Sequence, residues 1–355
     1  MNKTTKNNLI TYAMVVLAFV IMQILISAGS ISSLLQGLMV PLCTYIILAV
    51  SLNLVVGILG ELSLGHAGFM CVGAFTSAFF SKCTRDVIAS DGLRFFLALL
   101  IGIVTAAIFG MLIGIPVLRL KGDYLAIVTL AFGEIIKNMV NVLYIGKDSK
   151  GFHVTTKDVM ALNMDADGTV ILNGPQGITG TPKNSTFVIG FILILLTLFI
   201  VQNLINSRDG RAIMAIRDNR IAAESIGINI TKYKLMAFTI SAAMAGAAGV
   251  LYAHNISTLT ANTNNFGYNM SITILVFVVL GGIGNIRGSI IAAVILTLLP
   301  ELLRGMKDYR MLIYAIVLIV MMLFNWSPKA IEWREKLNDW RKKHFSFGKK
   351  AKEVE

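Results

Sequence analysis

Long runs of apolar residues, separated by short polar segments, make up most of the chain. A helix needs about 20 apolar residues to cross the hydrocarbon core of a bilayer, whereas a strand of a membrane barrel needs only about 10. The apolar runs of this chain have the length of helices. We therefore expect ten membrane-spanning helices, over residues 9–28, 34–57, 63–80, 95–117, 122–145, 187–206, 235–254, 270–284, 288–303 and 311–325.

Composition leads to the same class of protein. The 355 residues are 56% hydrophobic and only 14% charged, which is more apolar material than one soluble core of this size can hold. In lipid, each backbone N–H and C=O must be paired within the chain, as it is in helices. We predict an all-α integral membrane protein, a polytopic bundle over residues 1–326. The first apolar run is interpreted as an anchor, because it lacks the cleavage site of a signal peptide.

Three polar segments lie outside the predicted spans. Residues 146–186 contain Asp-Gly and Gly-Pro turns around the β-favouring run TVIL, which predicts a small hairpin outside the membrane. Residues 207–234 form a loop on the opposite side. The basic tail, residues 327–355, places two tryptophans near one helical face, so we expect it to lie on the inner leaflet.

The net charge of +12 gives an orientation. Basic residues concentrate on the cytoplasmic side of membrane proteins. With both termini in the cytoplasm, the inner segments hold about two-thirds of the 31 Lys and Arg residues. We therefore interpret the positive charge as orientation towards anionic lipid rather than as a nucleic-acid surface.

Two of the apolar runs are interrupted by glycine clusters. These are VVGILGELSLGHAGFMCVG, Val55 to Gly73, and VVLGGIGNIRGSIIAA, Val278 to Ala293. Broken helices expose backbone groups that only a water-lined cavity tolerates, which favours a transport pathway. Close packing of helices at small residues explains the same clusters. The sequence leaves both interpretations open.

Few side chains are candidates for chemistry. His66, in the first glycine cluster, is either a hydrogen-bonded structural residue or a ligand or proton relay. Glu134 and Lys137 fall inside the fifth span on one helical face, where they can neutralise each other or serve a polar pathway. The three cysteines lack disulfide or metal-ligand spacing. No catalytic triad, phosphate loop or dinucleotide motif is found, so we predict no enzyme, metal site or cofactor.

The stretch GRAIMAIRDNRIAAESIGINITKYK is polar and punctuated like a helix. Asp218 or Asn219 can cap a helix start, and Gly227 can end the helix. So short a helix needs something to dock against, which could be the chain's own spans, the bilayer surface or another protein. Small alanines favour protein packing. The expected docking face comprises Ala212, Ala215, Ile216, Ala222, Ala223 and Ile226.

This stretch and the span after it resemble the cytoplasmic loop and following span of the permease subunits of branched-chain amino-acid ABC importers. Other segments resemble the same family, in the family's order, over most of residues 40–295. The form LSLGHAGF is similar to the LivM-type subunit rather than to its LivH-type partner. These segments are YIILAVSLNLVVGILGELSLGHAGFMCVGAF, LKGDYLAIVTLAFGEIIKNMV, NGPQGITG and LGGIGNIRGSIIAA.

The resemblance implies an ABC importer permease fold in a bacterial inner membrane. The implied partners are a second, unlike permease of the LivH type, two cytoplasmic ABC ATPases and an extracytoplasmic substrate-binding protein. The implied substrates are leucine, isoleucine and valine, with urea or short amides carried by related permeases. No ATP-binding motif is found in the chain, so the separate ATPases would supply the energy.

The same resemblance gives roles to particular residues. An older permease pattern, Glu-Ala-Ala, three residues, then Gly, is met only in part, because Ile221 replaces the glutamate. The residues expected to couple to the ATPase are Arg217, Asp218, Asn219, Ala222, Ala223, Glu224 and Gly227. The residues expected to lie near the translocation path are Ser63, Gly65, His66, Gly68 and Glu134.

An ion-coupled secondary transporter is the rival interpretation. It would use Glu134 and His66 as ion-coupled groups, and it predicts transport by this chain alone.

Overall fold

A computed structural model describes residues 3–29, 32–85, 87–120, 122–165 and 168–326. The predicted basic tail, residues 327–355, lies outside the described residues. The chain forms two compact units, Met1–Val294 and Ile295–Glu355.

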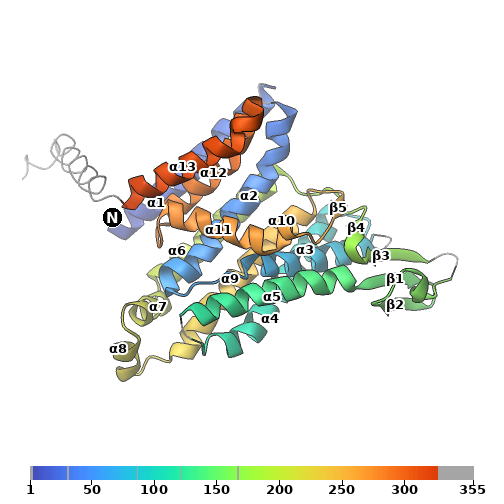
Figure 1. The fold of residues 1–355 in the computed structure, drawn as a ribbon, viewed down its shortest axis with the longest axis horizontal. Helices are drawn as coiled ribbons and strands as arrows, with labels where there is room; N and C mark the ends of the chain where they lie inside the picture. Colours follow the sequence, from blue (N-terminus) through green and yellow to red (C-terminus); the bar gives the residue numbers. More distant parts are fainter. Residues whose placement is uncertain (1–2, 30–31, 86, 121, 166–167, 327–355) are drawn as a thin grey trace, which may run out of the picture. The chain divides into compact units, whose positions relative to one another are not determined.

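Helices dominate the described part of the chain (Figure 1). The helix α12 begins in the first unit and ends in the second, which also holds α13. The α-helices are α1 (Lys3–Ser27), α2 (Ser33–Asn53), α3 (His66–Cys83), α4 (Asp91–Val117), α5 (Asp123–Val142), α6 (Phe187–Asn206), α7 (Arg208–Asp218), α8 (Arg220–Ser225), α9 (Ile230–Ala253), α10 (Thr263–Phe266), α11 (Tyr268–Gly281), α12 (Ile286–Leu302) and α13 (Arg310–Trp326). A π-helix, Leu54–Leu59, continues α2, and short 3₁₀ turns cover Met160–Leu162, Gly174–Gln176 and Leu303–Tyr309.

The predicted all-α membrane architecture is confirmed. Among the described residues, eight helical segments are long and apolar enough to cross a membrane, and each lies over one of the expected spans. The other two expected spans are also largely helical: α3 covers residues 66–80 of the span expected at 63–80, and α13 covers residues 311–325. The helix α3 is the more polar of these two, since it begins with His66 and carries Lys82 in its last turn.

The core of the first unit is built around α3. This helix packs against α9, α4 and α5, and α9 also packs against α2 and α4. A Cβ atom on Gly73 would lie 2.4 Å from the main-chain O of Gly246, and one on Gly249 would lie 2.1 Å from that of Met70. Helices in lipid gain little from hydrophobic contact with each other, so small residues that bring backbones together are what hold α3 against α9.

A small β-region extends one end of α5. The strands β1 (Tyr144–Asp148), β2 (Gly151–Thr155) and β3 (Thr169–Asn173) form an antiparallel sheet in the order β2-β1-β3. The predicted strand TVIL is β3. Two further strands, β4 (Ile178–Thr179) and β5 (Thr258–Leu259), pair with each other. In Figure 1 the three-stranded sheet and the helices α7 and α8 lie at opposite ends of the helices of the first unit.

Candidate functional site

The loop between α6 and α9 contains two short helices, because two polar residues cap their starts. The Ser207 side chain accepts a hydrogen bond from Gly210 N–H at the start of α7, and Asn219 accepts one from Ala222 N–H at the start of α8. Of the two residues expected to cap this helix, Asp218 and Asn219, it is Asn219 that caps α8. Gly227 has a φ of 85°, a left-handed conformation that glycine adopts at low cost, and it ends α8 as predicted.

The predicted docking face of this loop is wrong at two residues. Ala223 and Ile216 are only 2% and 4% exposed, and they pack with Ile230 of the same chain in a small apolar cluster. The exposed apolar side of α8 instead presents Ile221 and Ile226, which are 81% and 75% exposed. The helix has apolar residues on two sides, and the start of α9 covers the side that contains Ala223.

Arg217 anchors α7 to the end of the π-helix. Its Nη1 donates to the main-chain O of Gly57 at 3.0 Å, while its Nε and Nη2 donate to Asp218 Oδ1. Its methylene groups cover Gly60, where a Cβ atom would lie 2.5 Å from Arg217 Cγ. The helix α8 is thus joined, through α7 and Arg217, to the main-chain carbonyl of Gly57 in the π-helix.

A second anchor lies at the start of α9. Lys234 forms an ion pair with Glu61, and the two side chains are 6% and 15% exposed. Only Gly60 separates Glu61 from the end of the π-helix, so α7 and α9 hold the same short segment. A buried ion pair is costly to break from one side, which makes this connection stiff.

The two glycine clusters meet in the structure. The Asn53 side chain accepts from Gly284 N–H at 2.9 Å and donates to Ser289 Oγ at 2.9 Å. A Cβ atom on Gly57 would lie 2.3 Å from Gly284 N. The first cluster includes the π-helix and the non-helical residues 60–65, and the second includes the turn between α11 and α12. Both clusters therefore interrupt helices and also allow close packing, so the two features that the sequence left as alternatives occur together.

His66 lies in packed protein at the start of α3. It is 2% exposed, and its Nε2 lies 2.7 Å from Ser51 Oγ of α2. The Ser51 main-chain O accepts from Ser241 Oγ of α9. This geometry is that of a hydrogen-bonded structural residue, one of the two interpretations that the sequence left open.

The other residues expected along a path lie where α3 faces α5. A Cβ atom on Gly65 would lie 2.2 Å from the main-chain O of Thr129, and one on Gly68 would lie 2.7 Å from Gly133 Cα. Ser63 is buried, and its Oγ has no hydrogen-bond partner among the described residues. Gly65 and Gly68 thus bring the start of α3 into direct backbone contact with α5.

Glu134 lies in α5, directly after Gly133, and it is held by two polar contacts. It pairs with Lys137, and it accepts a hydrogen bond from the N–H of Tyr268 at the start of α11 at 2.8 Å. Lys137 also donates to Thr263 Oγ1 of α10. The carboxylate therefore caps a helix that begins within a broken span, where the helix dipole favours negative charge. The predicted pairing of Glu134 with Lys137 is confirmed.

Sequence reasoning missed Asn53, Lys234 and Glu61 as connecting residues. The sequence did carry one indication of their role. Each is a polar side chain in or beside an apolar run, and such a side chain is costly in a membrane unless it has a partner. The partners lie far away in the sequence, so no local pattern could name them. No group of three or more His, Cys, Asp or Glu residues in the described part is placed to hold a metal ion.

A helical membrane bundle with broken spans, buried polar connections and a short helical loop at one end has the features of a transport permease. Residues 33–324 match the family described as the branched-chain amino acid transport system / permease component, and the chain belongs to this family. No solved structure matches the chain.

Three relatives illustrate the range of similarity. The chain is 35% identical to the high-affinity branched-chain amino acid transport system permease protein LivM of Salmonella typhimurium strain LT2, covering 92% of this chain and 75% of the relative. It is 33% identical to LivM of Escherichia coli strain K12 over the same shares. It is 25% identical to the permease protein LivH of the same E. coli strain, covering 71% of this chain and 79% of LivH.

Proposed function

We propose that this chain is the LivM-type permease subunit of an ATP-driven importer for leucine, isoleucine and valine. The greater similarity to the two LivM proteins than to LivH supports this assignment. The proposed partners are a LivH-type permease, two cytoplasmic ABC ATPases and an external substrate-binding protein. The chain crosses the inner membrane with both termini in the cytoplasm, which leaves the β-sheet region outside and α7 and α8 inside.

The observation that carries the proposal is the exposed helix α8 on a firmly anchored loop. Ile221 and Ile226 face outwards on a short polar loop, where apolar side chains of that size are expected to meet a partner. The loop is fixed to the spans by Arg217 and Lys234. A partner protein can bind the exposed apolar side of such a helix. The anchors of the loop then connect a displacement of the helix to the spans.

The proposed mechanism is mechanical. ATPase closure displaces α8 and α7, and Arg217 passes the displacement to Gly57 in the π-helix. The π-helix passes it across the Gly57 and Gly284 contact to the turn before α12. A π-helix closes its backbone hydrogen bonds over five residues instead of four and is frequent at functional sites, so we propose that the span shifts here.

Substitution of the exposed face tests the coupling. We expect Ile221→Arg to insert normally, to lose the ATPase subunits on purification and to lose leucine uptake, because the variant places a charge in an apolar contact. Val87→Arg is the matched control, since Val87 is 79% exposed in the segment that follows α3, away from α7 and α8. An Ile221→Arg importer that retains its ATPases and imports at the parent rate would refute the coupling role of α8.

A further inference from the structure

The last turn of α3 is bonded to two other elements at the end of the bundle that carries the β-sheet region. The Lys82 Nζ donates to the main-chain O atoms of Val170 and Ile171 in β3, at 2.8 and 3.4 Å. One residue earlier, Ser81 Oγ lies 2.8 Å from Nε2 of His254, the residue that follows α9. Ser81 and His254 are 1% and 0% exposed, so this contact lies in packed protein. Neighbouring side chains of one helix therefore hold a strand and a second helix.

The contacts of Lys82 exceed those that a helix end requires. A lysine in the last turn of a helix is stabilised by the helix dipole and by the free carbonyls of its own helix. The Lys82 ammonium instead donates to a strand, and it forms no ion pair with a carboxylate among the described residues. A hydrogen bond from a charged donor is stronger than one between neutral groups. Lys82 is therefore placed to hold β3 against α3.

The β-sheet region is also joined to α5 and α9. The strand β1 begins two residues after α5 ends, and it pairs with β3, while β5 follows α9 and pairs with β4. Thr181 Oγ1, two residues after β4, donates to the main-chain O of Ile256 at 2.6 Å. Asn141 Nδ2 of α5 donates to the main-chain O of Ala261 at 2.9 Å. Figure 1 shows the strands gathered at one end of α3 and α5.

These bonds form a closed path through the helices. The path leads from α3 through Ser81 to the end of α9, then through β5 and β4 into the β-sheet region, and back through β3 and Lys82 to α3. Through β1, α5 belongs to the same path. Separation of these helix ends would break several hydrogen bonds at once and leave partly buried polar groups unsatisfied. We therefore expect the three ends to stay together.

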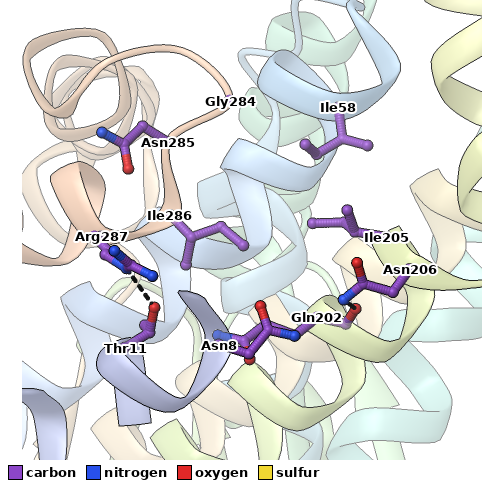
Figure 2. A pocket seen from close by; sticks show the side chains of 10 residues that line it. All are labelled: Asn8, Thr11, Ile58, Gln202, Ile205, Asn206, Gly284, Asn285, Ile286 and Arg287. Atoms are coloured by element: carbon purple, nitrogen blue, oxygen red, sulfur yellow. Dashed lines mark hydrogen bonds between the residues drawn. The ribbon is translucent and has the colours of Figure 1, made fainter. Parts of the chain in front are cut away.

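The opposite end of the bundle is less closed. A pocket of about 280 Å³ lies there between α1, the π-helix, α6 and the turn before α12 (Figure 2). Ile58 of the π-helix, Ile205 of α6 and Gly284 of the turn line it from three elements. The helix α9 reaches from this end, where Lys234 forms its ion pair, to the joined end, where His254 lies. Space at one end and bonds at the other favour relative movement of helices near the pocket and common movement at the joined end.

We propose that the ends of α3, α5 and α9 that carry the β-sheet region move as one body during transport, and that Lys82 is the positioning residue that joins α3 to this body. A displacement received at the start of α9 then reaches all three helices together. In the proposed orientation the body lies on the outer side of the membrane. Its part in leucine import rests on the proposed function, whereas the joints themselves do not.

The ratio of leucine imported to ATP hydrolysed by the complete importer tests Lys82. Lys82→Met removes the donor and keeps an unbranched side chain. We expect Lys82→Met complexes to assemble and hydrolyse ATP, while the leucine imported per ATP falls at least about threefold, because α3 no longer follows the other two helices. Lys82→Arg keeps a cationic donor and should retain more of this ratio. Loss of folded protein lowers both rates alike, so the ratio separates a positioning role from a general loss of stability.

The matched control is Lys157→Met. Lys157 is an exposed lysine of the same β-sheet region, and its ammonium makes no hydrogen bond or ion pair among the described residues. This variant should import and hydrolyse ATP as the parent does. Hydrogen exchange on the full chain in nanodiscs provides a second readout. Lys82→Met should lose protection in β3 and in the last turn of α3, whereas Lys157→Met should not.

A disulfide between β4 and β5 tests whether this joint must open during transport. Thr179 and Thr258 lie opposite each other on these strands and are both exposed, so cysteines at the two positions are within reach of a disulfide. Thr179→Cys and Thr258→Cys are introduced together into a chain whose three native cysteines are replaced by alanine. We expect the oxidised and reduced forms to import leucine equally, because the two strands stay together throughout transport.

Two results would overturn the proposal. One is an equal ratio of leucine to ATP in Lys82→Met and the parent, and the other is import that stops when the disulfide between positions 179 and 258 forms. A parent complex that imports no leucine would instead refute the proposed function. The exchange of β3 in Lys82→Met would still test the joint in that case.

Discussion

Among the described residues, two lysine side chains are almost fully covered by protein, and each has a carboxylate beside it. Lys137 and Lys234 have side chains that are 9% and 6% exposed, and they pair with Glu134 and Glu61. Removing one partner of such a pair leaves an uncompensated buried charge, whereas replacing both can be nearly neutral. Single and double variants therefore separate a structural pair from a functional one.

For the pair in α5 we expect Glu134→Gln to destabilise the chain by about 3 kcal/mol, because Lys137 is left with its charge and no counter-charge. The glutamine keeps an oxygen for the Tyr268 N–H, so the loss reports the ion pair rather than the helix cap. Adding Lys137→Met should restore the thermal midpoint and the leucine uptake. A double variant with restored stability but no uptake would show that Glu134 serves the transport path.

Asp148 gives the β-sheet region a pH dependence. Its carboxylate accepts from the main-chain N–H groups of Lys150, Gly151 and Asp165 and lies 2.9 Å from His153 Nε2. Burial raises the pKa of the Asp148 carboxyl, but these hydrogen bonds together hold it below its usual value of 3.8. A depressed carboxyl pKa adds stability above the unfolded value, and this stability is lost as the pH falls through the folded value.

We therefore expect amide protection in the β1–β2 hairpin, corrected for intrinsic exchange, to hold from neutral pH down to about pH 4 and to fall at lower pH. Asp148→Asn should lose protection at neutral pH and should lack the acid transition. Hydrogen exchange read by mass spectrometry on the full chain measures both. Loosening of the parent hairpin between neutral pH and pH 5 would contradict this prediction, since Asp148 remains ionised there.

Among the helices, the contact of α3 with α5 depends on glycine. Overpacking a tight contact typically costs about 1–3 kcal/mol, and more where backbone opposes the new atoms. We expect Gly68→Leu to insert into the membrane but to abolish uptake, because its Cβ alone would lie 2.7 Å from Gly133 Cα. Gly37→Leu in α2 is the control, since no heavy atom lies within 4 Å of the position of its Cβ. Normal uptake by Gly68→Leu would remove this contact from the mechanism.

The attachment of α7 to the π-helix makes a separate prediction. Arg217→Met keeps an unbranched side chain over Gly60 but loses the donor to Gly57 O. We expect the complex to assemble and hydrolyse ATP while uptake falls at least about tenfold, since the displacement of α8 no longer reaches the spans. Arg220→Met, an exposed residue at the start of α8, should retain more uptake. Equal uptake in Arg217→Met and the parent would refute this transmission route.

Local chemistry explains which features could be predicted from the sequence. Span lengths, the cap at Asn219 and the end at Gly227 depend on neighbouring residues, and the i,i+3 pair of Glu134 and Lys137 depends on one helical turn. The side of α8 that is covered depends on Ile230 and the fold of α9, so the sequence could not exclude Ala223 from the docking face. The meeting of Gly57 with Gly284 is equally non-local.

For the molecule as a whole, the family assignment and the coupling loop lead to one claim: this chain moves its substrate only with ATPase partners. The coupling role that we propose for α7 and α8 would have no counterpart in a carrier that works alone. The rival carrier would use His66 and Glu134 as ion-coupled groups, but His66 lies beside Ser51 and Glu134 pairs with Lys137. The two possibilities differ in what they require for uptake.

The most direct measurement is leucine uptake into proteoliposomes that contain either the complete complex or this chain alone. We predict uptake by the complex with external binding protein and internal ATP, loss of that uptake without ATP, and no uptake by the chain alone under a proton or sodium gradient. Gradient-driven accumulation of leucine by the chain alone would contradict the claim and would make it an ion-coupled carrier.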